Sequence, residues 1–270
     1  IYTYLHIYRV VGSKEYNFMK ESTGNESEII EVDNTEKFSP TSGADFFLNP
    51  KIRNNSEVNP ARILNAAKDN QEIQGVKFEN FGFVNDGWLK AEDQQSVLRI
   101  LAGQYLTIPY EPWEEFKTNS ATSMTLEFDF KVRNITNETD PILQVCSIVQ
   151  ATGKPLGLYM RPLDGFINTV TKTTEADQNF AWMEDKRTHI AINVVHALRS
   201  SATSSTTISL VRVFVNGVLN REFVFDTATP NEFISSAGHG GIRIGQSDAD
   251  IDIYSIRCYK KALSADDCMQ

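Results

Sequence analysis

The feature that most limits how this chain can fold is the side-chain alternation that recurs from residue 75 to the end. Residues 125–132, TLEFDFKV, place an apolar side chain at every second position, which is the period of a strand with one buried face. So many short strands predict an all-β fold in which antiparallel sheets pack face to face. The other predicted strands are residues 96–100, 105–110, 141–150, 157–161, 165–171, 188–196, 208–215, 218–225, 242–245 and 251–259.

The clearest local signal is a hairpin centred on Asn216-Gly217, between two segments rich in β-branched residues. Asn-Gly favours a two-residue turn with positive φ at both positions. Helix signals are few. Asn59-Pro60 followed by Ile63 and Ala67 predicts one brief helix, and the sequence from Ser264 to Asp267 resembles a capping box that opens a second one.

Composition divides the chain into two parts. Residues 1–11 alternate like a strand, whereas residues 12–43 are rich in Glu, Ser, Asn and Thr and have few large apolar side chains. We expect residues 1–43 to be the end of a preceding module plus a linker, and residues 44–270 to form the β-domain. Because the sequence begins without Met in what reads as a strand, we also expect it to be a piece of a longer polypeptide.

The formal net charge is −9 at pH 7, and no Lys/Arg cluster reverses that sign locally. Such a surface repels phosphate backbones, so nucleic acid is not expected as a partner. No apolar run approaches the roughly 20 residues that span a bilayer, so no membrane insertion is expected. The three cysteines, Cys146, Cys258 and Cys268, are read as buried free thiols, with a Cys258–Cys268 bridge as the alternative.

Several phrases resemble a known family. The segments RTHIAINV from Arg187, VRVFVNGVLNREFVF from Val211 and IRIGQSDADIDIYSIRCYKKALSADD from Ile242 resemble the closing half of a laminin-G-like, concanavalin A-type jelly roll. The phrases from Asp86 and Thr125 are similar to its opening strands. The stretch ADFFLNPKIRNNSEVNPARI from Ala44 is similar to versions in structural proteins of tailed phages of gut Bacteroidota.

This resemblance implies a two-sheet antiparallel jelly-roll sandwich with one or two short helices. It also implies a non-catalytic module, without a cofactor, of a larger virion or cell-surface protein that binds glycan or neighbouring protein subunits. In the phage version the module would belong to a tail, fibre or baseplate in the virion and be present as a homo-oligomer. The alternatives are a glycoside hydrolase or lyase on the same fold and a purely structural spacer, and outside a virion the expected location is extracellular or the cell surface.

An enzyme that cleaves glycans on this fold would need two carboxylates roughly 5–9.5 Å apart. Glu127 and Asp129 resemble the first half of the Glu-x-Asp-x-x-Glu motif of jelly-roll glycoside hydrolases, but Val132 stands where the second Glu belongs. The shorter Glu-x-Asp-x-Glu variant fails at Lys131. We therefore interpret Glu127 and Asp129 as the solvated outer face of a strand.

One segment has the composition of a cation site. Asp248, Asp250 and Asp252 alternate within QSDADID, and calcium prefers several carboxylate oxygens at close range. The segment lacks the later Gly and Glu of an EF-hand, so a weak structural calcium site at Asp248 and Asp250 is one hypothesis. In the other, Asp250 and Asp252 cap turns and face solvent.

Sugars are bound by aromatic faces together with a few hydrogen-bonding groups. The large rings at or near predicted loops are Trp88, Trp113, Trp182 and Tyr110, with Tyr159 also nearby. We take the first four as candidate ligand-binding residues. The competing interpretation is that Trp88 and Trp182 are buried rings of the core.

Overall fold

The structure is a computed structural model that describes residues 6–11, 14–19, 29–30, 43–51, 59–110, 123–140, 142–149, 155–168, 179–200, 205–227 and 241–268. The chain divides into two compact units, residues 1–42 together with Gln270, and residues 43–269. The first unit holds a three-stranded antiparallel sheet of β1 (His6–Val11), β2 (Lys14–Met19) and β3 (Ile29–Ile30) in that order.

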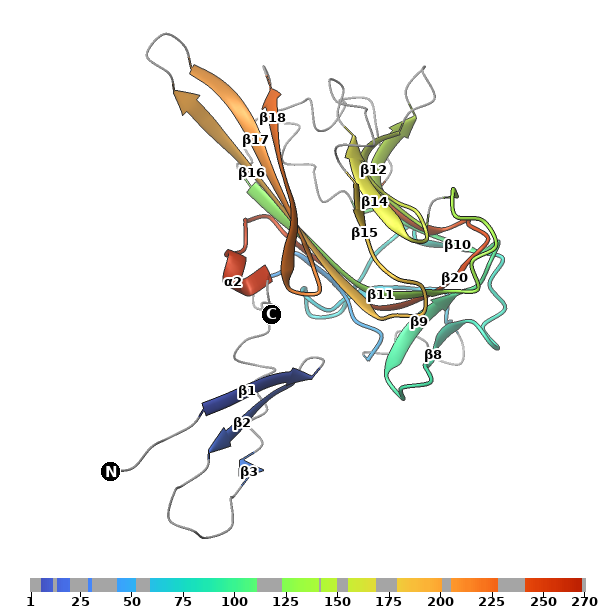
Figure 1. The fold of residues 1–270 in the computed structure, drawn as a ribbon. Coiled ribbons are helices and arrows are strands. Elements are labelled where there is room, and N and C mark those ends of the chain that lie inside the picture. The colour runs from blue at the N-terminus through green and yellow to red at the C-terminus, as the bar shows by residue number, and fades with distance from the viewer. Residues whose placement is uncertain are drawn as a thin grey trace. The chain divides into compact units, whose positions relative to one another are not determined.

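The second unit is a sandwich of two antiparallel sheets (Figure 1). The larger sheet has eight strands in the order β18-β17-β16-β11-β20-β9-β8, with β4 paired to β20 beside β9. Its strands are β4 (Phe46–Leu48), β8 (Gly87–Lys90), β9 (Ser96–Ile100), β11 (Ser123–Arg133), β16 (Thr188–Ser200), β17 (Ser205–Val215), β18 (Val218–Thr227) and β20 (Asp250–Tyr259).

The second sheet has seven strands in the order β15-β14-β13-β12-β19-β10-β7. These are β7 (Lys77–Glu79), β10 (Tyr105–Ile108), β12 (Leu143–Val149), β13 (Pro155–Met160), β14 (Asp164–Asn168), β15 (Asn179–Ala181) and β19 (Ile242–Gly245). The two-sheet antiparallel sandwich predicted from the alternation is therefore confirmed, and its arrangement is consistent with a jelly roll.

Of the two local predictions, the hairpin turn is confirmed and the first helix is wrong. Asn216 and Gly217 have φ values of 50° and 76°, as the predicted hairpin turn between β17 and β18 requires. The brief helix predicted after Asn59-Pro60 is wrong, because this segment forms the two-stranded pair β5 (Leu64–Asn65) and β6 (Gln71–Glu72). The Asn65 side chain accepts from the backbone N–H of Phe47 at 2.9 Å and donates to the carbonyl of Asp45 at 2.8 Å, which ties the segment to β4.

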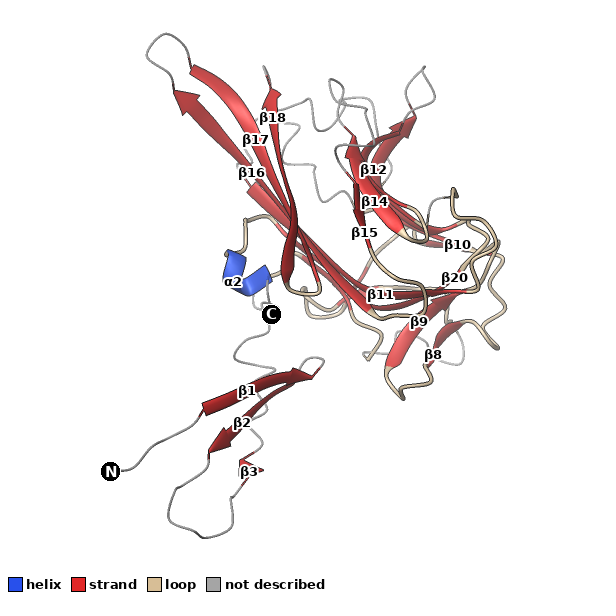
Figure 2. Ribbon diagram, viewed as in Figure 1, coloured by secondary structure: helices blue, strands red, loops and turns tan. Residues whose placement is uncertain are grey.

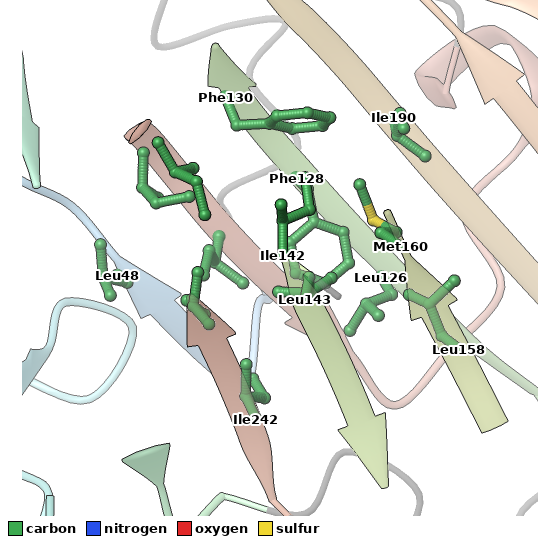
Figure 3. Close-up of a cluster of buried hydrophobic side chains, with 14 of the residues drawn as sticks. Leu48, Leu126, Phe128, Phe130, Ile142, Leu143, Leu158, Met160, Ile190 and Ile242 are labelled. Atoms are coloured by element: carbon green, nitrogen blue, oxygen red, sulfur yellow. The ribbon is translucent and has the colours of Figure 1, made fainter. Parts of the chain in front are cut away.

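The core lies between the two sheets. Leu126, Phe128 and Phe130 project from β11 towards Leu158 and Met160 of β13 (Figure 3), and these side chains are at most 2% exposed. A small pocket here is lined only by apolar side chains, so it is packing space without groups that could do chemistry. Its lining is Phe128, Phe130, Ile142, Leu143, Met160, Ile244, Ile251 and Ile253.

The larger sheet is also partly covered on its other face. The segment after β20 crosses that face and ends in α2 (Ala265–Cys268), drawn in blue in Figure 2. It is the one helix among the described residues. Thr125 of β11 accepts from the N–H of Leu263 at 2.9 Å, and Asn193 of β16 donates to the Leu263 carbonyl at 2.6 Å. A second apolar cluster forms beneath this cover from Ala44, Ala191, Phe214, Tyr259, Leu263 and Cys268.

The predicted C-terminal helix is confirmed in its capping. The Ser264 hydroxyl accepts from the N–H of Asp267 at 3.1 Å, and the Asp267 carboxylate accepts from the N–H of Ser264 at 3.2 Å, which is the reciprocal pattern of a capping box. Cys268 is fully buried, as expected. No helix in the described residues is long and apolar enough to cross a membrane.

The hypothesis of a Cys258–Cys268 bridge is wrong. Both thiols are free and buried. Cys258 packs in the core between the sheets, whereas Cys268 packs with Tyr259 in the second cluster. Because Cys258 and Tyr259 are consecutive residues of a strand, they point to opposite faces of the sheet. The side chain of Cys146 lies outside the described residues.

Candidate ligand-binding face

The seven-stranded sheet turns one face to the core and the other away from it. Leu106, Ile108, Ile242 and Ile244 are fully buried in the core, so the side chains that alternate with them project from the opposite face. We call this face, defined by Tyr105, Thr107, Arg243, Gln144 and Tyr159, the outer face of the seven-stranded sheet. All five side chains are half-buried.

Strand register brings these residues into one row. Thr107 of β10 is opposite Arg243 of β19, Arg243 is opposite Gln144 of β12, and Gln144 is opposite Tyr159 of β13. Directly opposed residues in antiparallel strands lie on the same face with Cβ atoms about 5 Å apart. The row therefore presents a hydroxyl, a guanidinium, an amide and a phenol next to one another.

Arg243 is held by a ring. Its Cζ lies 4.6 Å from the centroid of the Tyr105 ring, a cation–π contact that fixes the plane of the guanidinium. Its Nε is buried and has no hydrogen-bond partner among the described residues. The row thus combines aromatic surface with polar groups, the combination that carbohydrate sites use.

Three of the four aromatic candidates chosen from the sequence, Trp88, Trp182 and Tyr110, lie elsewhere. Trp88 is 7% and Trp182 is 9% exposed, and their indole N–H groups donate to the carbonyls of Pro60 at 2.9 Å and Pro162 at 2.8 Å. Tyr110 stacks on Phe46 with the ring centroids 4.8 Å apart. These contacts favour the core interpretation for Trp88 and Trp182, and the half-buried Tyr110 ring packs against the core. Trp113 lies outside the described residues, and its role as a ligand contact stays a prediction.

The interpretation of Glu127 as a solvated strand residue is wrong, because Glu127 is only 2% exposed beneath the C-terminal segment. Its Oε1 lies 3.5 Å from the Nε2 of His189, and its Oε2 lies 3.7 Å from an Nη of Arg257. Asp129 accepts from Arg187 Nε at 2.8 Å and from its Nη2 at 2.5 Å. Both carboxylates are thus engaged with cations of the same sheet face.

The environment of Glu127 sets its ionisation. Burial raises the pKa of the Glu127 carboxyl, but the hydrogen bond from His189 and the charge of Arg257 outweigh burial and leave the pKa below its ordinary value. Burial also raises the pKa of the Tyr259 hydroxyl, and the charge of Glu127 adds to that rise. Glu127 is therefore ionised at neutral pH, whereas a general acid would need a raised pKa.

The predicted cation site is divided among other contacts. Asp250 accepts from the N–H of Ala102 at 3.0 Å and from the amide of Asn134 at 2.7 Å, one bond to each oxygen. Asp252 is 1% exposed and pairs with Arg99 at 2.6 Å. The interpretation that Asp252 faces solvent is therefore wrong. Asp248 is exposed. Within the described part of the chain, no group of three or more potential ligand side chains could hold a metal ion. Calcium at Asp248 and Asp250 stays a prediction.

Sequence reasoning missed Arg243 as a candidate. Its strand was predicted with the observed bounds, and alternation with Ile242 and Ile244 already placed its side chain away from the core. The missing information was the pairing of β19 between β10 and β12, which brings Tyr105 and Gln144 beside it. A single sequence does not contain that pairing, because the three strands are far apart along the chain.

The strand order and the two packed sheets place the chain in the class of antiparallel β-sandwich folds. Solved structures with this fold include receptor-binding domains of botulinum neurotoxins. The binding domain of botulinum neurotoxin DC in complex with rat synaptotagmin II matches with a TM-score of 0.52 and 12% identity, over 85% of this chain and 51% of that chain. The receptor-binding domain of the mosaic serotype C/D matches with a TM-score of 0.51 and 12% identity, over 84% of this chain and 49% of that chain.

The chain therefore spans about half the length of these solved structures. At this identity the likeness shows the fold alone. No protein-family model and no curated protein matches the sequence.

Proposed function

We propose that this chain is a non-catalytic binding module that attaches to glycan or to neighbouring protein subunits. The observation that carries the proposal is the row of aromatic and polar side chains on the outer face of the seven-stranded sheet. The neurotoxin domains that share the fold add support, since one of them is a binding domain in complex with rat synaptotagmin II.

The enzymatic alternative has less support. Glu127 and Asp129 each face a cation rather than each other, and the pocket between the sheets has only apolar lining. A glycoside hydrolase needs one protonated and one ionised carboxyl across a sugar-sized space, which these two residues do not supply.

A glycan array combined with a reducing-sugar release assay tests the proposal. We expect saturable binding to a subset of glycans and no release of reducing ends. Release of sugar would contradict a non-catalytic module and favour the hydrolase or lyase. Silence in both assays would favour the third interpretation, a structural spacer.

We further propose that the module belongs to a virion, as part of the tail, fibre or baseplate of a phage, where several copies assemble. The support is the resemblance of the stretch from Ala44 to structural proteins of tailed phages of gut Bacteroidota. Purified particles should then contain this chain at a fixed stoichiometry. Finding it only in bacterial membranes or culture supernatant would contradict this assignment.

A further inference from the structure

Arg243 differs from seven other arginines whose side chains are described. Each of these seven forms an ion pair with a carboxylate; they are Arg62, Arg99, Arg133, Arg161, Arg187, Arg212 and Arg257. Within the described part of the chain, the Arg243 side chain makes no ion pair and no hydrogen bond, and it contacts the Tyr105 ring. A half-buried guanidinium held in place without a counter-ion is prepared to receive an anion.

The charges around Arg243 favour the same ligand. Lys77 of β7 is opposite Thr107, which is in turn opposite Arg243, so the row carries two cations. Lys77 is exposed. Among the described residues paired with β10, Glu79 carries a carboxylate, and it is opposite Tyr105 rather than Arg243. The row is therefore locally positive, on a chain whose net charge is −9.

The remainder of the row fits a sugar better than a free ion. Gln144 can both donate and accept hydrogen bonds beside Arg243. Tyr159 lies two strands from Arg243, about 10 Å away at the usual strand spacing, and its ring offers an apolar face with a polar end. A short oligosaccharide can bridge that distance.

We propose that the outer face of the seven-stranded sheet binds an acidic glycan, with the carboxylate of a sialic or uronic acid residue on the Arg243 guanidinium. The adjoining sugar lies over Gln144 and reaches Tyr159. This inference rests on the proposed glycan-binding function and specifies its ligand class. The guanidinium donates two parallel hydrogen bonds to the carboxylate, which a neutral sugar cannot accept in the same way.

The test is calorimetric titration of the full chain with matched acidic and neutral probes. The pairs are sialyllactose with lactose, and trigalacturonate with its methyl ester. We expect at least one acidic probe to bind about tenfold or more tightly than its neutral partner, as loss of a charge-assisted contact implies. Arg243→Gln should remove that preference, Arg243→Lys should retain part of it, and Lys77→Gln should weaken it by roughly twofold to fivefold.

Arg212→Gln is the matched control, because Arg212 lies on the other sheet in an exposed pair with Glu222, and it should bind like the wild type. Thermal melts establish that each variant is folded, and the exposed Lys77 variant gives a readout even if Arg243→Gln unfolds. Equal affinity for acidic and neutral probes, or binding of acidic probes that Arg243→Gln leaves intact, would overturn the acidic site but not the glycan-binding function. Sulfated lactose is added as a sulfate-bearing probe, and its binding without binding of either carboxylate probe would overturn the carboxylate assignment. Binding of none of these probes would overturn the acidic site, and a glycan array without any binding would overturn glycan binding as well.

Discussion

Two glycines show how single atoms constrain this sandwich. Gly103 and Gly245 both have positive φ, 78° and 88°. A Cβ on Gly103 would meet nothing within 4 Å, whereas a Cβ on Gly245 would lie 2.3 Å from the carbonyl oxygen of Gln104. That oxygen also accepts from the N–H of Gln246 at 2.7 Å, so it cannot move away without loss of a backbone hydrogen bond.

We therefore predict that Gly245→Ala lowers the free energy of unfolding by roughly 3 kcal/mol or more, since it adds a backbone clash to an unfavourable φ. Gly103→Ala should cost only about 1 kcal/mol, the conformational part alone. Urea denaturation of both variants measures the difference. Equal losses would mean that the close approach at Gly245 does not exist.

Glu127 is the residue at which sequence reasoning failed most clearly. Its alternation with Leu126 and Phe128 correctly placed it on the face opposite the core, and that face is usually solvated in antiparallel sheets. Here the chain returns after β20 and covers it. The cover begins at residues 260–263, far along the sequence, so no local pattern around Glu127 could have revealed it.

We predict that Glu127→Gln lowers the free energy of unfolding by about 2–4 kcal/mol at pH 7, because it leaves the charge of Arg257 without its partner. Since folding lowers the pKa of Glu127, its stabilising contribution is present above the ordinary value of about 4.3 and is lost as pH falls through the lower, folded value. The variant should therefore lose less stability than the wild type between pH 5 and pH 3. Urea titrations across that range measure it.

The control for Glu127 is Glu222→Gln, which removes a carboxylate from the pair with Arg212, where both side chains are more than 40% exposed. Its effect should stay within about 0.5 kcal/mol. If the two variants behaved alike, Glu127 would not be buried as described.

At the scale of elements, the strands were easier to predict than their neighbours. Strands β9 and β19 have the predicted bounds, and the Asn216-Gly217 turn has the predicted backbone, because alternation and turn chemistry are local. The helix expected after Asn59 failed for the opposite reason. Asn59 does accept from the N–H of Ala61 at 3.2 Å, as an N-cap would, but the hydrogen bonds of Asn65 to the segment of β4 decide the conformation.

The C-terminal segment gives an element-scale prediction. Cys268 is fully buried, and burial raises its pKa to about 12, so very little thiolate is present at pH 8. We expect iodoacetamide to leave Cys268 unmodified in the folded protein and to modify it in guanidinium, as measured by peptide mass mapping. Ser264→Ala, which removes the helix cap, should increase the rate. Rapid alkylation of the folded wild type would show that residues 260–268 do not cover the sheet.

At the scale of the whole molecule, residues 43–269 form a compact unit with one apolar core between two sheets. The composition of the sequence predicted a boundary between residues 43 and 44. That the second unit is an independent domain remains a prediction. A chain that begins at Gly43 should unfold in a single thermal transition, within a few degrees of the corresponding transition of the full chain. A broad transition, or a drop of about 10 °C or more, which for this length corresponds to several kcal/mol, would show that the first 42 residues support the sandwich.

The proposed function rests on the side chains that the two sheets present on their outer faces. The larger sheet holds Glu127, Asp129 and Asp252 in ion pairs. The seven-stranded sheet carries Arg243 and Tyr159 on its outer face. Alternation in the sequence predicted which residues leave the core, but the row itself depends on strand order, which the sequence alone does not reveal. We therefore propose a surface that binds a glycan without altering it.

The most direct test is to recover the ligand after binding. The full chain is titrated with the best-binding acidic oligosaccharide, and the same sample is then incubated and analysed by mass spectrometry. We predict saturable binding that Arg243→Gln abolishes, with the oligosaccharide recovered at its original mass. Shortened or unsaturated products, or binding that does not depend on Arg243, would contradict the account.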